Sequence, residues 1–120
     1  MNLPNDVRGI QRLLTDKAFN PYIDIRNREA VLGHLVEEVG ELARAFMQKY
    51  SPSPKDFYPI LLSRFCHGLS KNNGNIDDEL GDVHILLSFC SESLGCDLQT
   101  AIKNKIMKNV HDGKFGVRNH

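Results

Sequence analysis

Apolar residues recur at helical spacing along the first half of this chain. Between residues 27 and 49 they lie three or four positions apart, as on one face of a helix: Val31, Leu35, Val39, Leu42 and Phe46. Asn27 is a suitable N-cap, because its short side chain can accept a hydrogen bond from the first helical turn. The pattern predicts a long helix over about residues 27–49, with this stripe in the core.

A second stripe of the same kind follows in the latter half. Its members again lie three or four apart: Ile76, Leu80, Val83, Leu87, Cys90 and Leu94. Asn75 precedes the stripe as a potential N-cap, and Gly95 follows it as a potential terminator. We expect a helix from about residue 76 to residue 94 that buries this stripe.

Shorter stretches flank these two helices. Residues 5–18 predict a helix that stops before Pro21, and Asp97 is a potential N-cap for a final helix through about residue 110. Residues 55–70 predict a short helix or a packed flap, whose aromatic side chains suit core or subunit packing better than stacking on a base: Phe57, Tyr58 and Phe65. No stretch alternates with period two, so we predict an all-α bundle of about four main helices.

Composition narrows the class of protein. A chain of 120 residues with 41% hydrophobic and 25% charged residues suits one compact domain, here residues 1–120. Fifteen basic and fifteen acidic residues give no net charge, which argues against binding to long nucleic acid. A small anionic ligand is compatible with this balance, because it requires only a local cluster of charge.

The cysteines and the N-terminus indicate a cytoplasmic setting. Cys66, Cys90 and Cys96 are an odd count without C-x-x-C spacing, which argues against a disulfide framework and a thiolate zinc site. The start of the chain lacks the apolar segment of a signal peptide, and no apolar run has the length of a membrane span.

Two similar phrases of acidic residues stand out within the two long helices. "EVGELA" begins at Glu38 and "ELGDVH" begins at Glu79, and each places two acids three positions apart around a glycine. Residues three apart lie about 60° apart around a helix, so Glu38 projects with Glu41 and Glu79 with Asp82. Each pair lies at the margin of an apolar stripe. If the helices pack antiparallel, the four carboxylates converge.

Such convergence is unfavourable unless a cation is bound. Two like charges about 4 Å apart repel by about 4 kcal/mol at an effective dielectric near 20. All-oxygen ligation favours Mg²⁺, Mn²⁺ or Ca²⁺ over zinc. Gly40 and Gly81 are unfavourable inside helices and suggest a close approach of backbone or ligand. The alternative is that each acidic pair is an ordinary solvated helix face.

The two segments together resemble a known family. "GHLVEEVGELARAF" followed by "DDELGDVHILLSF" is similar to the E-E-x-x-E … E-x-x-D signature of the all-α nucleoside triphosphate pyrophosphohydrolases. These are the MazG-like enzymes, related to dimeric dUTPases and to phosphoribosyl-ATP pyrophosphohydrolase. The resemblance covers about residues 26–50 and 75–110. It implies a MazG-like bundle completed by oligomerisation into a homodimer or homotetramer.

The resemblance also implies an activity. In this family the acids hold Mg²⁺, for which Mn²⁺ can substitute, and water attacks the α-phosphorus of a (d)NTP to release (d)NMP and pyrophosphate. The matching metal-binding and catalytic residues here are Glu38, Glu41, Glu79 and Asp82, with Glu37 auxiliary. "KIMKN" is similar to a family stretch that binds the substrate phosphates, which implies that role for Lys105, Lys108 and Asn109.

Some alternatives stay open at the level of sequence. The long segment between the two acidic motifs and the altered ending after Asn109 leave base and sugar specificity undetermined. His34, one turn before Glu38, is interpreted as an ordinary polar helix position. The leading hypothesis is an enzyme that cleanses the nucleotide pool. Its rivals are a catalytically silent helical module and a metal-dependent phosphohydrolase of another nucleotide derivative.

Overall fold

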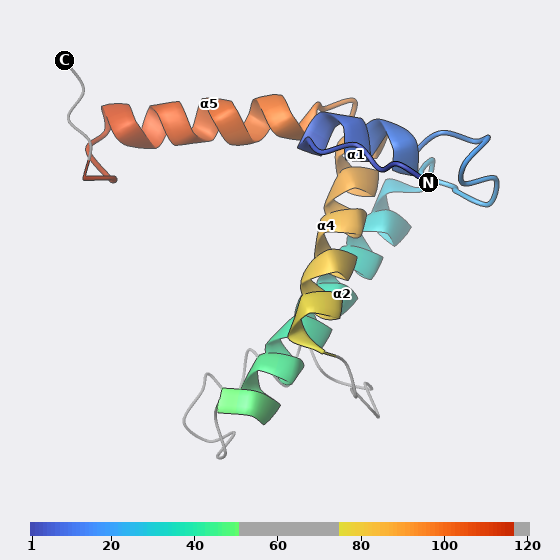
Figure 1. Cartoon of the computed structure of the whole chain (residues 1–120), viewed down its shortest axis with the longest axis horizontal. Coiled ribbons are helices and arrows are strands. Elements are labelled where there is room, and N and C mark those ends of the chain that lie inside the picture. The colour runs from blue at the N-terminus through green and yellow to red at the C-terminus, as the bar shows by residue number, and fades with distance from the viewer. Residues whose placement is uncertain (51–74, 117–120) are drawn as a thin grey trace.

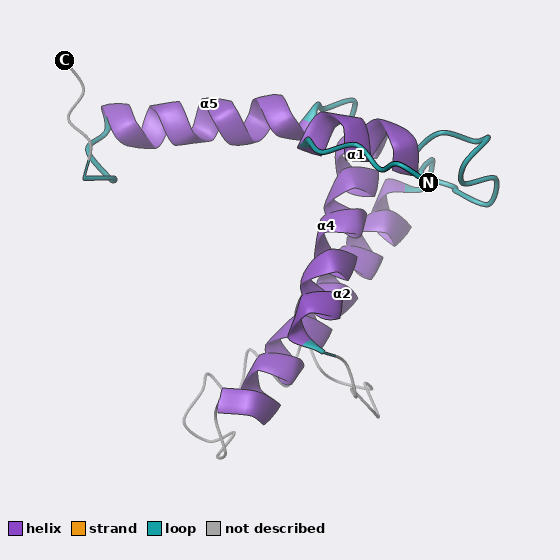
Figure 2. Ribbon diagram, in the orientation of Figure 1, coloured by secondary structure: helices purple, strands orange, loops and turns teal. Residues whose placement is uncertain are grey.

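The computed structural model describes residues 1–50 and 75–116, and every regular element within these ranges is a helix. The helices there are α1 (Val7–Leu14), α2 (Arg28–Tyr50), α4 (Ile76–Ser93) and α5 (Leu98–His111), labelled as in Figure 1. Figure 2 shows loops between them and no strand in the described part of the chain. The predicted all-α class is confirmed.

The two long helices form the centre of the molecule. In Figure 1, α2 and α4 run side by side in opposite directions, and α1 lies across the end where α2 begins and α4 ends. The last helix, α5, extends away from this pair and contacts α1 and the adjoining end of α4. The antiparallel packing on which the predicted convergence of acids depends is therefore present.

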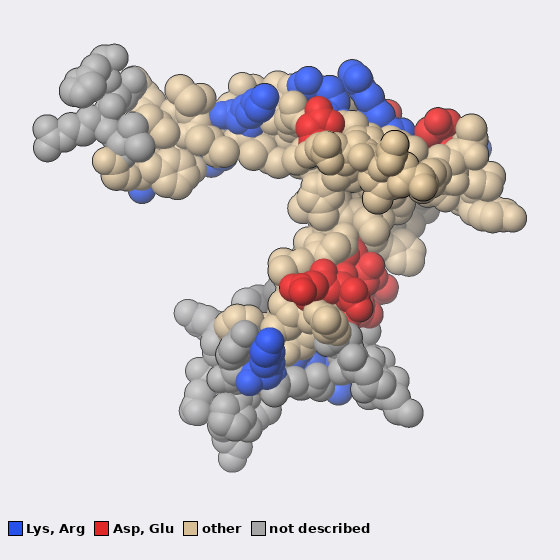
Figure 3. All heavy atoms as spheres, viewed as in Figure 1, with Lys and Arg blue, Asp and Glu red and all other residues tan. Residues whose placement is uncertain are grey.

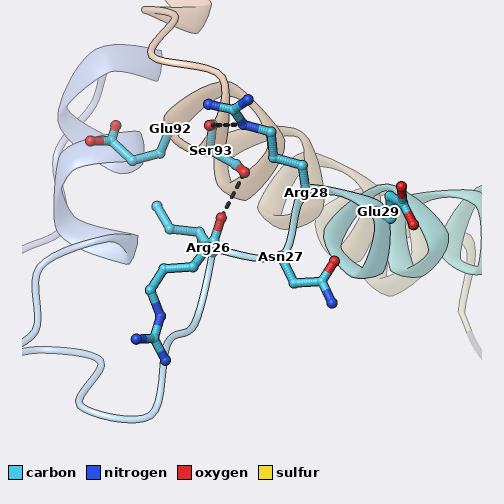
Figure 4. Close-up of a pocket in the computed structure, with 7 residues that line it drawn as sticks. Arg26, Asn27, Arg28, Glu29, Glu92 and Ser93 are labelled. Carbon is cyan, nitrogen blue, oxygen red and sulfur yellow. Dashed lines mark hydrogen bonds between the residues drawn. The ribbon is translucent and has the colours of Figure 1, made fainter.

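Hydrogen bonds set the register of α2 against α4. Arg28 Nε donates to the carbonyl of Ser93 at 3.0 Å, and Ser93 Oγ donates to the carbonyl of Ile25 at 2.7 Å (Figure 4). One turn further along, the thiol of Cys90 lies 3.8 Å from the carbonyl of Val31. These contacts join the start of α2 to the end of α4, and so they decide which residues face each other further along the pair.

The predicted helix ends are largely confirmed. Each expected N-cap accepts a backbone N–H two or three residues on, at 3.1 Å for Asn27, 2.7 Å for Asn75 and 3.1 Å for Asp97. Gly95 follows α4 with φ of 70°, a conformation that glycine adopts more readily than other residues. Capping depends on neighbours in sequence, which is why sequence alone located these ends.

The first helix is shorter than the predicted 5–18. It spans Val7–Leu14, with Asp6 as its N-cap. Beyond its end, Thr15 Oγ1 donates to a carbonyl of the last turn at 2.8 Å, and Asp16 Oδ1 accepts a backbone N–H at 2.9 Å. Side chains of this kind compete with the helical backbone for hydrogen bonds, so the chain continues in turns.

A polar corner joins α1 to the start of α5. Arg8 and Asp97 form an ion pair at 2.8 Å, and hydrogen bonds from Arg8 hold the pKa of Asp97 well below its usual range. Gln11, 3% exposed, donates from Nε2 to the carbonyl of Cys96 at 2.8 Å and accepts from the backbone N–H of Leu98 at 2.9 Å. These bonds set the direction in which α5 leaves the molecule.

The expected apolar stripes are only partly buried, which corrects the sequence prediction. Val31 is 6% exposed, as expected. Several other stripe residues keep a third or more of their surface exposed: Val39, Phe46, Leu80, Leu87 and Leu94. Each long helix carries apolar residues over a wider arc than the other described long helix covers. The described part of the chain therefore presents apolar surface on α2 and α4.

Two other expectations concern the middle segment and membranes. The short helix or flap predicted for residues 55–70, with Phe57, Tyr58 and Phe65, lies outside the described residues. None of the described helices combines the length and the apolar composition needed to cross a bilayer.

Candidate metal centre

Four carboxylates from the two long helices meet at one point. Glu38 and Glu41 come from α2, and Glu79 and Asp82 come from α4. Each offers one oxygen, and these oxygens all lie within 4.8 Å of one another. Figure 3 shows acidic atoms gathered over the α2–α4 pair, and lysine and arginine atoms along α5. The convergence predicted from the two acidic phrases is confirmed as geometry.

Helix geometry and register together produce this arrangement. Spacing of three residues keeps the two acids of each helix on neighbouring parts of one face. The antiparallel register then pairs the first acid of one helix with the second acid of the other: Asp82 acts more strongly than Glu79 on the charge of Glu38, and Glu41 acts most strongly on Glu79. Local spacing alone would have supplied two separate pairs.

The cluster is electrostatically unfavourable when no cation is present. Burial, a hydrogen bond with Glu41 and the charges of Glu41, Asp82 and Glu79 raise the pKa of Glu38 from 4.5 to about 7. Glu79 is 7% exposed, and its pKa is also raised, first by burial and then by the charges of Glu41 and Asp82. Burial and like charge both disfavour the ionised form of a carboxyl group. A proton or a metal ion relieves the repulsion.

Two oxygens in the cluster have no hydrogen-bond partner. Oε2 of Glu38 and Oε2 of Glu79 are both buried and unpaired. Buried polar atoms are nearly always satisfied in folded proteins, so an unpaired carboxylate oxygen calls for a ligand. Mg²⁺ and Mn²⁺ accept all-carboxylate and water coordination. The donor set and its unpaired oxygens thus fit a hard divalent cation.

Glu37, the predicted auxiliary residue, lies outside this group of four. Its carboxylate is 3.7 Å from Nδ1 of His34, and the two side chains are 65% and 68% exposed. Asp78, which also precedes an acidic pair, is exposed and contributes charge to the environment of Glu79. The structure therefore separates an inner cluster from an outer acidic margin, and the auxiliary role of Glu37 stays a prediction.

The predicted phosphate-binding residues are not brought to the cluster within one chain. Lys105 and Lys108 are exposed on α5, which extends away from the α2–α4 pair (Figure 1). Asn109, near the end of α5, is partly buried, and its Oδ1 is buried without a hydrogen-bond partner. Any action of these residues on phosphates at the acids requires a second copy of the chain or a different position of α5.

The two glycines of the acidic phrases differ in their surroundings. Gly40 is buried. Gly81 is exposed, and a Cβ placed on it would meet no atom within 4 Å. Within the described residues no backbone neighbour accounts for Gly81, and the expected close approach of a ligand stays a prediction. A ligand or another subunit would have to supply the reason for that glycine.

A cavity of ≈ 340 Å³ lies between the loop around residue 23 and the two long helices, and the sequence analysis does not predict it. Leu86 and Phe89 of α4 line it, four and seven residues after Asp82. His34 and Val31 of α2 line it, four and seven residues before Glu38. A signal was available, because these intervals continue the faces that carry the acids.

Comparison with known families agrees with this geometry. A sequence model of the MazG nucleotide pyrophosphohydrolase domain matches residues 26–112, which include both acidic helices and α5. No curated protein and no solved structure matches the chain at a significant level. The matched segment makes up well over half of the 120 residues and indicates a hydrolase that acts on nucleotides. This chain belongs to the family of MazG nucleotide pyrophosphohydrolase domains.

Proposed function

We propose that this protein is a Mg²⁺-dependent nucleoside triphosphate pyrophosphohydrolase. It cleaves the bond between the α- and β-phosphates of a (d)NTP and yields a (d)NMP and pyrophosphate. The observation that carries the proposal is the cluster of four carboxylates with two unpaired buried oxygens, in a chain of this family. Its cellular role would be to cleanse the nucleotide pool of the cytoplasm.

Glu38, Glu41, Glu79 and Asp82 hold the metal ion in this proposal. A bound divalent ion would draw the triphosphate to the acids, neutralise charge on the reacting phosphate and lower the pKa of a bound water. Mg²⁺ suits a site of this kind because it is bound by a few carboxylates together with substrate phosphates, and Mn²⁺ accepts similar ligands. The chain's own contribution is to hold the four carboxylates together before the substrate arrives.

Lys105, Lys108 and Asn109 bind phosphate oxygens across a subunit interface in this proposal. The exposed helix α5 carries apolar side chains as well as lysines, with Ile102 40% and Ile106 46% exposed. A second copy that covered this apolar surface would also bring lysines close to an acidic site, where opposite charges attract. We therefore propose a homodimer or homotetramer whose site is completed between copies.

The decisive experiment measures the release of pyrophosphate and of phosphate from ordinary and modified (d)NTPs and from nucleoside diphosphates, without metal, with Mg²⁺ and with Mn²⁺. We expect Mg²⁺-dependent release of pyrophosphate with at least one member, and Glu79→Gln should abolish it. Release of single phosphates from nucleotide diphosphates would favour a phosphohydrolase of another derivative. Absence of turnover with every substrate and both metals would leave a catalytically silent module as the better account.

A further inference from the structure

The direction of α5 is decided at its first turn. The chain passes from α4 to α5 through residues 94–97, and α1 lies beside this connection (Figure 1). No residue of α5 is buried against the described part of the chain, and Ile106 and Met107 further along are 46% and 64% exposed. The contacts that orient the helix are therefore those that α1 and the end of α4 make with its start.

Gln11 of α1 binds the backbone on both sides of the N-cap of α5. Its Nε2 donates to the carbonyl of Cys96 at 2.8 Å, and its Oε1 accepts from the N–H of Leu98 at 2.9 Å. Nε2 also donates to the carboxylate of Glu92, near the end of α4, at 3.0 Å. An amide suits this place, because one side chain must donate and accept at the same time. A side chain that is only 3% exposed thus joins α4, the connection and α5.

Arg8, one turn before Gln11, holds the N-cap itself. Its Nε and Nη2 donate to the carboxylate of Asp97 at 3.0 and 2.8 Å, and Nη2 also donates to Thr100 Oγ1 at 3.1 Å. The backbone N–H of Arg8 donates to Gln99 Oε1 at 2.9 Å. Two hydrogen bonds from one guanidinium to one carboxylate fix orientation as well as distance. Because hydrogen bonds are directional and apolar contacts are not, this polar corner restrains the direction of α5.

A small change of direction at the polar corner is amplified along α5. Lys105 and Lys108 lie about 10 and 15 Å from Leu98 along the helix axis. A tilt of about 10° at Leu98 would therefore move Lys108 by about 3 Å, which is the length of a hydrogen bond. Phosphate binding by these lysines should thus depend on how firmly the first turn of α5 is held.

The polar corner lies well away from the acids. Glu92, its contact on α4, comes about 15 Å after Asp82 along the helix. Changes at Arg8 or Gln11 should therefore leave the four carboxylates and their metal ion undisturbed. Both residues also precede residue 26, where the match to the family begins, so the family match assigns them no role.

Resting on the function proposed above, we propose that Arg8 and Gln11 are positioning residues for substrate binding. They hold α5 in the direction that brings Lys105 and Lys108 of one copy to the substrate phosphates at the acids of another. Neither residue touches the substrate, and both act through the two lysines. Helix α1 thereby sets the affinity for the triphosphate and leaves the chemical step to the acids.

The test compares Arg8→Ala and Gln11→Met with Arg12→Ala, using the best triphosphate in the panel. The first two variants should raise KM and the inhibition constant of pyrophosphate about three- to tenfold, with a smaller loss in kcat, because phosphate contacts are weakened. Arg12 is an exposed arginine of the same helix outside the polar corner, and its loss should change neither constant. Arg8→Ala removes a partly exposed ion pair, so it decides the question if Gln11→Met does not fold.

A double-mutant cycle distinguishes positioning from a general loss of stability. In a variant that already carries Lys105→Ala and Lys108→Ala, Arg8→Ala should raise KM no further, because the side chains through which it acts are gone. Residual dipolar couplings should show a changed direction of α5 in Arg8→Ala, while α2 and α4 keep theirs. An equal further increase in KM without the two lysines, or unchanged couplings in α5, would overturn the assignment.

Binding without turnover separates this assignment from the proposed function. The probe is inorganic tripolyphosphate with Mg²⁺, measured by calorimetry. If the wild type binds it but hydrolyses no (d)NTP, and Arg8→Ala weakens binding while Arg12→Ala does not, the positioning assignment stands and the pyrophosphohydrolase assignment fails. If hydrolysis occurs and Arg8→Ala equals the wild type in KM and in tripolyphosphate affinity, the positioning assignment fails alone. A wild type that neither binds tripolyphosphate nor hydrolyses a triphosphate overturns both.

Discussion

Glu38 and Glu79 each bury a carboxylate oxygen that has no hydrogen-bond partner, and they do so beside two further acids. In a structure built only for stability, an amide or an apolar side chain at these positions would avoid both repulsion and desolvation. The acids therefore make the metal-free protein less stable than it could be. At the scale of single residues, this unfavourable arrangement is the strongest indication that a ligand is bound here.

Mg²⁺ should raise the melting temperature at neutral pH by several degrees, because it binds the folded cluster and not the unfolded chain. Glu79→Gln should abolish most of this increase, since it removes a charged ligand. The metal-free variant should melt no lower than the wild type, because repulsion is relieved. Scanning calorimetry with and without Mg²⁺ measures this. Glu29→Gln, an exposed acid in the first turn of α2, is the control and should respond to Mg²⁺ as the wild type does.

The raised pKa of Glu38 predicts how metal-free stability depends on pH. Because this pKa is about 7 in the folded protein and 4.5 without perturbation, the folded state binds the proton more tightly. The resulting stability is fully present below pH 4.5 and is lost as the pH rises through about 7. Glu38→Gln stays neutral and lacks this loss. Melting curves in chelator from about pH 5 to about pH 8 should show the wild type falling relative to the variant.

Gly81 allows a test of whether its position is reserved for a ligand or a second subunit. Alanine is favoured over glycine inside a helix by about 1 kcal/mol, and nothing lies within 4 Å of the added methyl group. Gly81→Ala should therefore raise the free energy of unfolding by about this amount in urea titrations. If activity falls while stability rises, the glycine serves substrate or subunit contact. A loss of stability would contradict the open surroundings seen here.

At the scale of elements, the α2–α4 pair and α5 have different roles in the proposed function. The pair α2–α4 brings the acids together through its own register, so all four carboxylates of the candidate metal centre come from one chain. By contrast, α5 is directed away from them by its polar corner with α1 (Figure 1). Loss of an acid should therefore affect the chemical step, and loss of a lysine on α5 should affect substrate binding first.

Steady-state kinetics can distinguish the role of the acids in the chemical step from that of the α5 lysines in substrate binding. Glu38→Gln and Asp82→Asn should lower kcat by about 10²-fold or more, because charge on the reacting phosphate is no longer stabilised. Lys105→Ala and Lys108→Ala should raise KM and weaken inhibition by pyrophosphate, with a smaller loss in kcat. Lys103→Ala, another exposed lysine of α5, is the matched control. An unchanged KM in both lysine variants would leave those residues without a part in substrate binding.

At the scale of the whole molecule, the described part of the chain exposes many large apolar side chains. Exposed apolar side chains lie on α2, α4 and α5 together, and the last helix projects with little cover (Figure 1). Large apolar patches mark surfaces that bind another protein, and closed symmetric pairs are the commonest solution. The family match spans residues 26–112 and includes all three helices. That residues 1–120 form one domain stays a prediction.

Sedimentation velocity at micromolar concentration should therefore find a dimer or a larger assembly. Ile106→Glu places a charge on the exposed apolar surface of α5 and should shift the protein toward the monomer. The same variant should lose activity if lysines reach the acids only from a second copy. Lys103→Glu changes charge on the same helix without removing apolar surface, and should stay assembled. A monomeric wild type would contradict the proposed completion of the site.

The sequence by itself determined what depends on neighbours along the chain. Caps at Asn27, Asn75 and Asp97 mark helix starts because a side chain reaches a backbone N–H two or three residues away. The sequence also predicted that the two acids of each pair project together, because spacing of three residues fixes how side chains project from a helix.

Only the tertiary structure decided the features that depend on contacts between residues far apart in the sequence. Stripe residues such as Leu80 and Leu94 have the right spacing for a core, yet they stay exposed because the described helices do not cover them. The direction of α5 depends on Arg8 and Gln11, which meet it from the far end of the sequence. The cavity beside the acids needs a loop and two helices in one register. Contacts between distant residues are set by packing as a whole, and no local pattern encodes them.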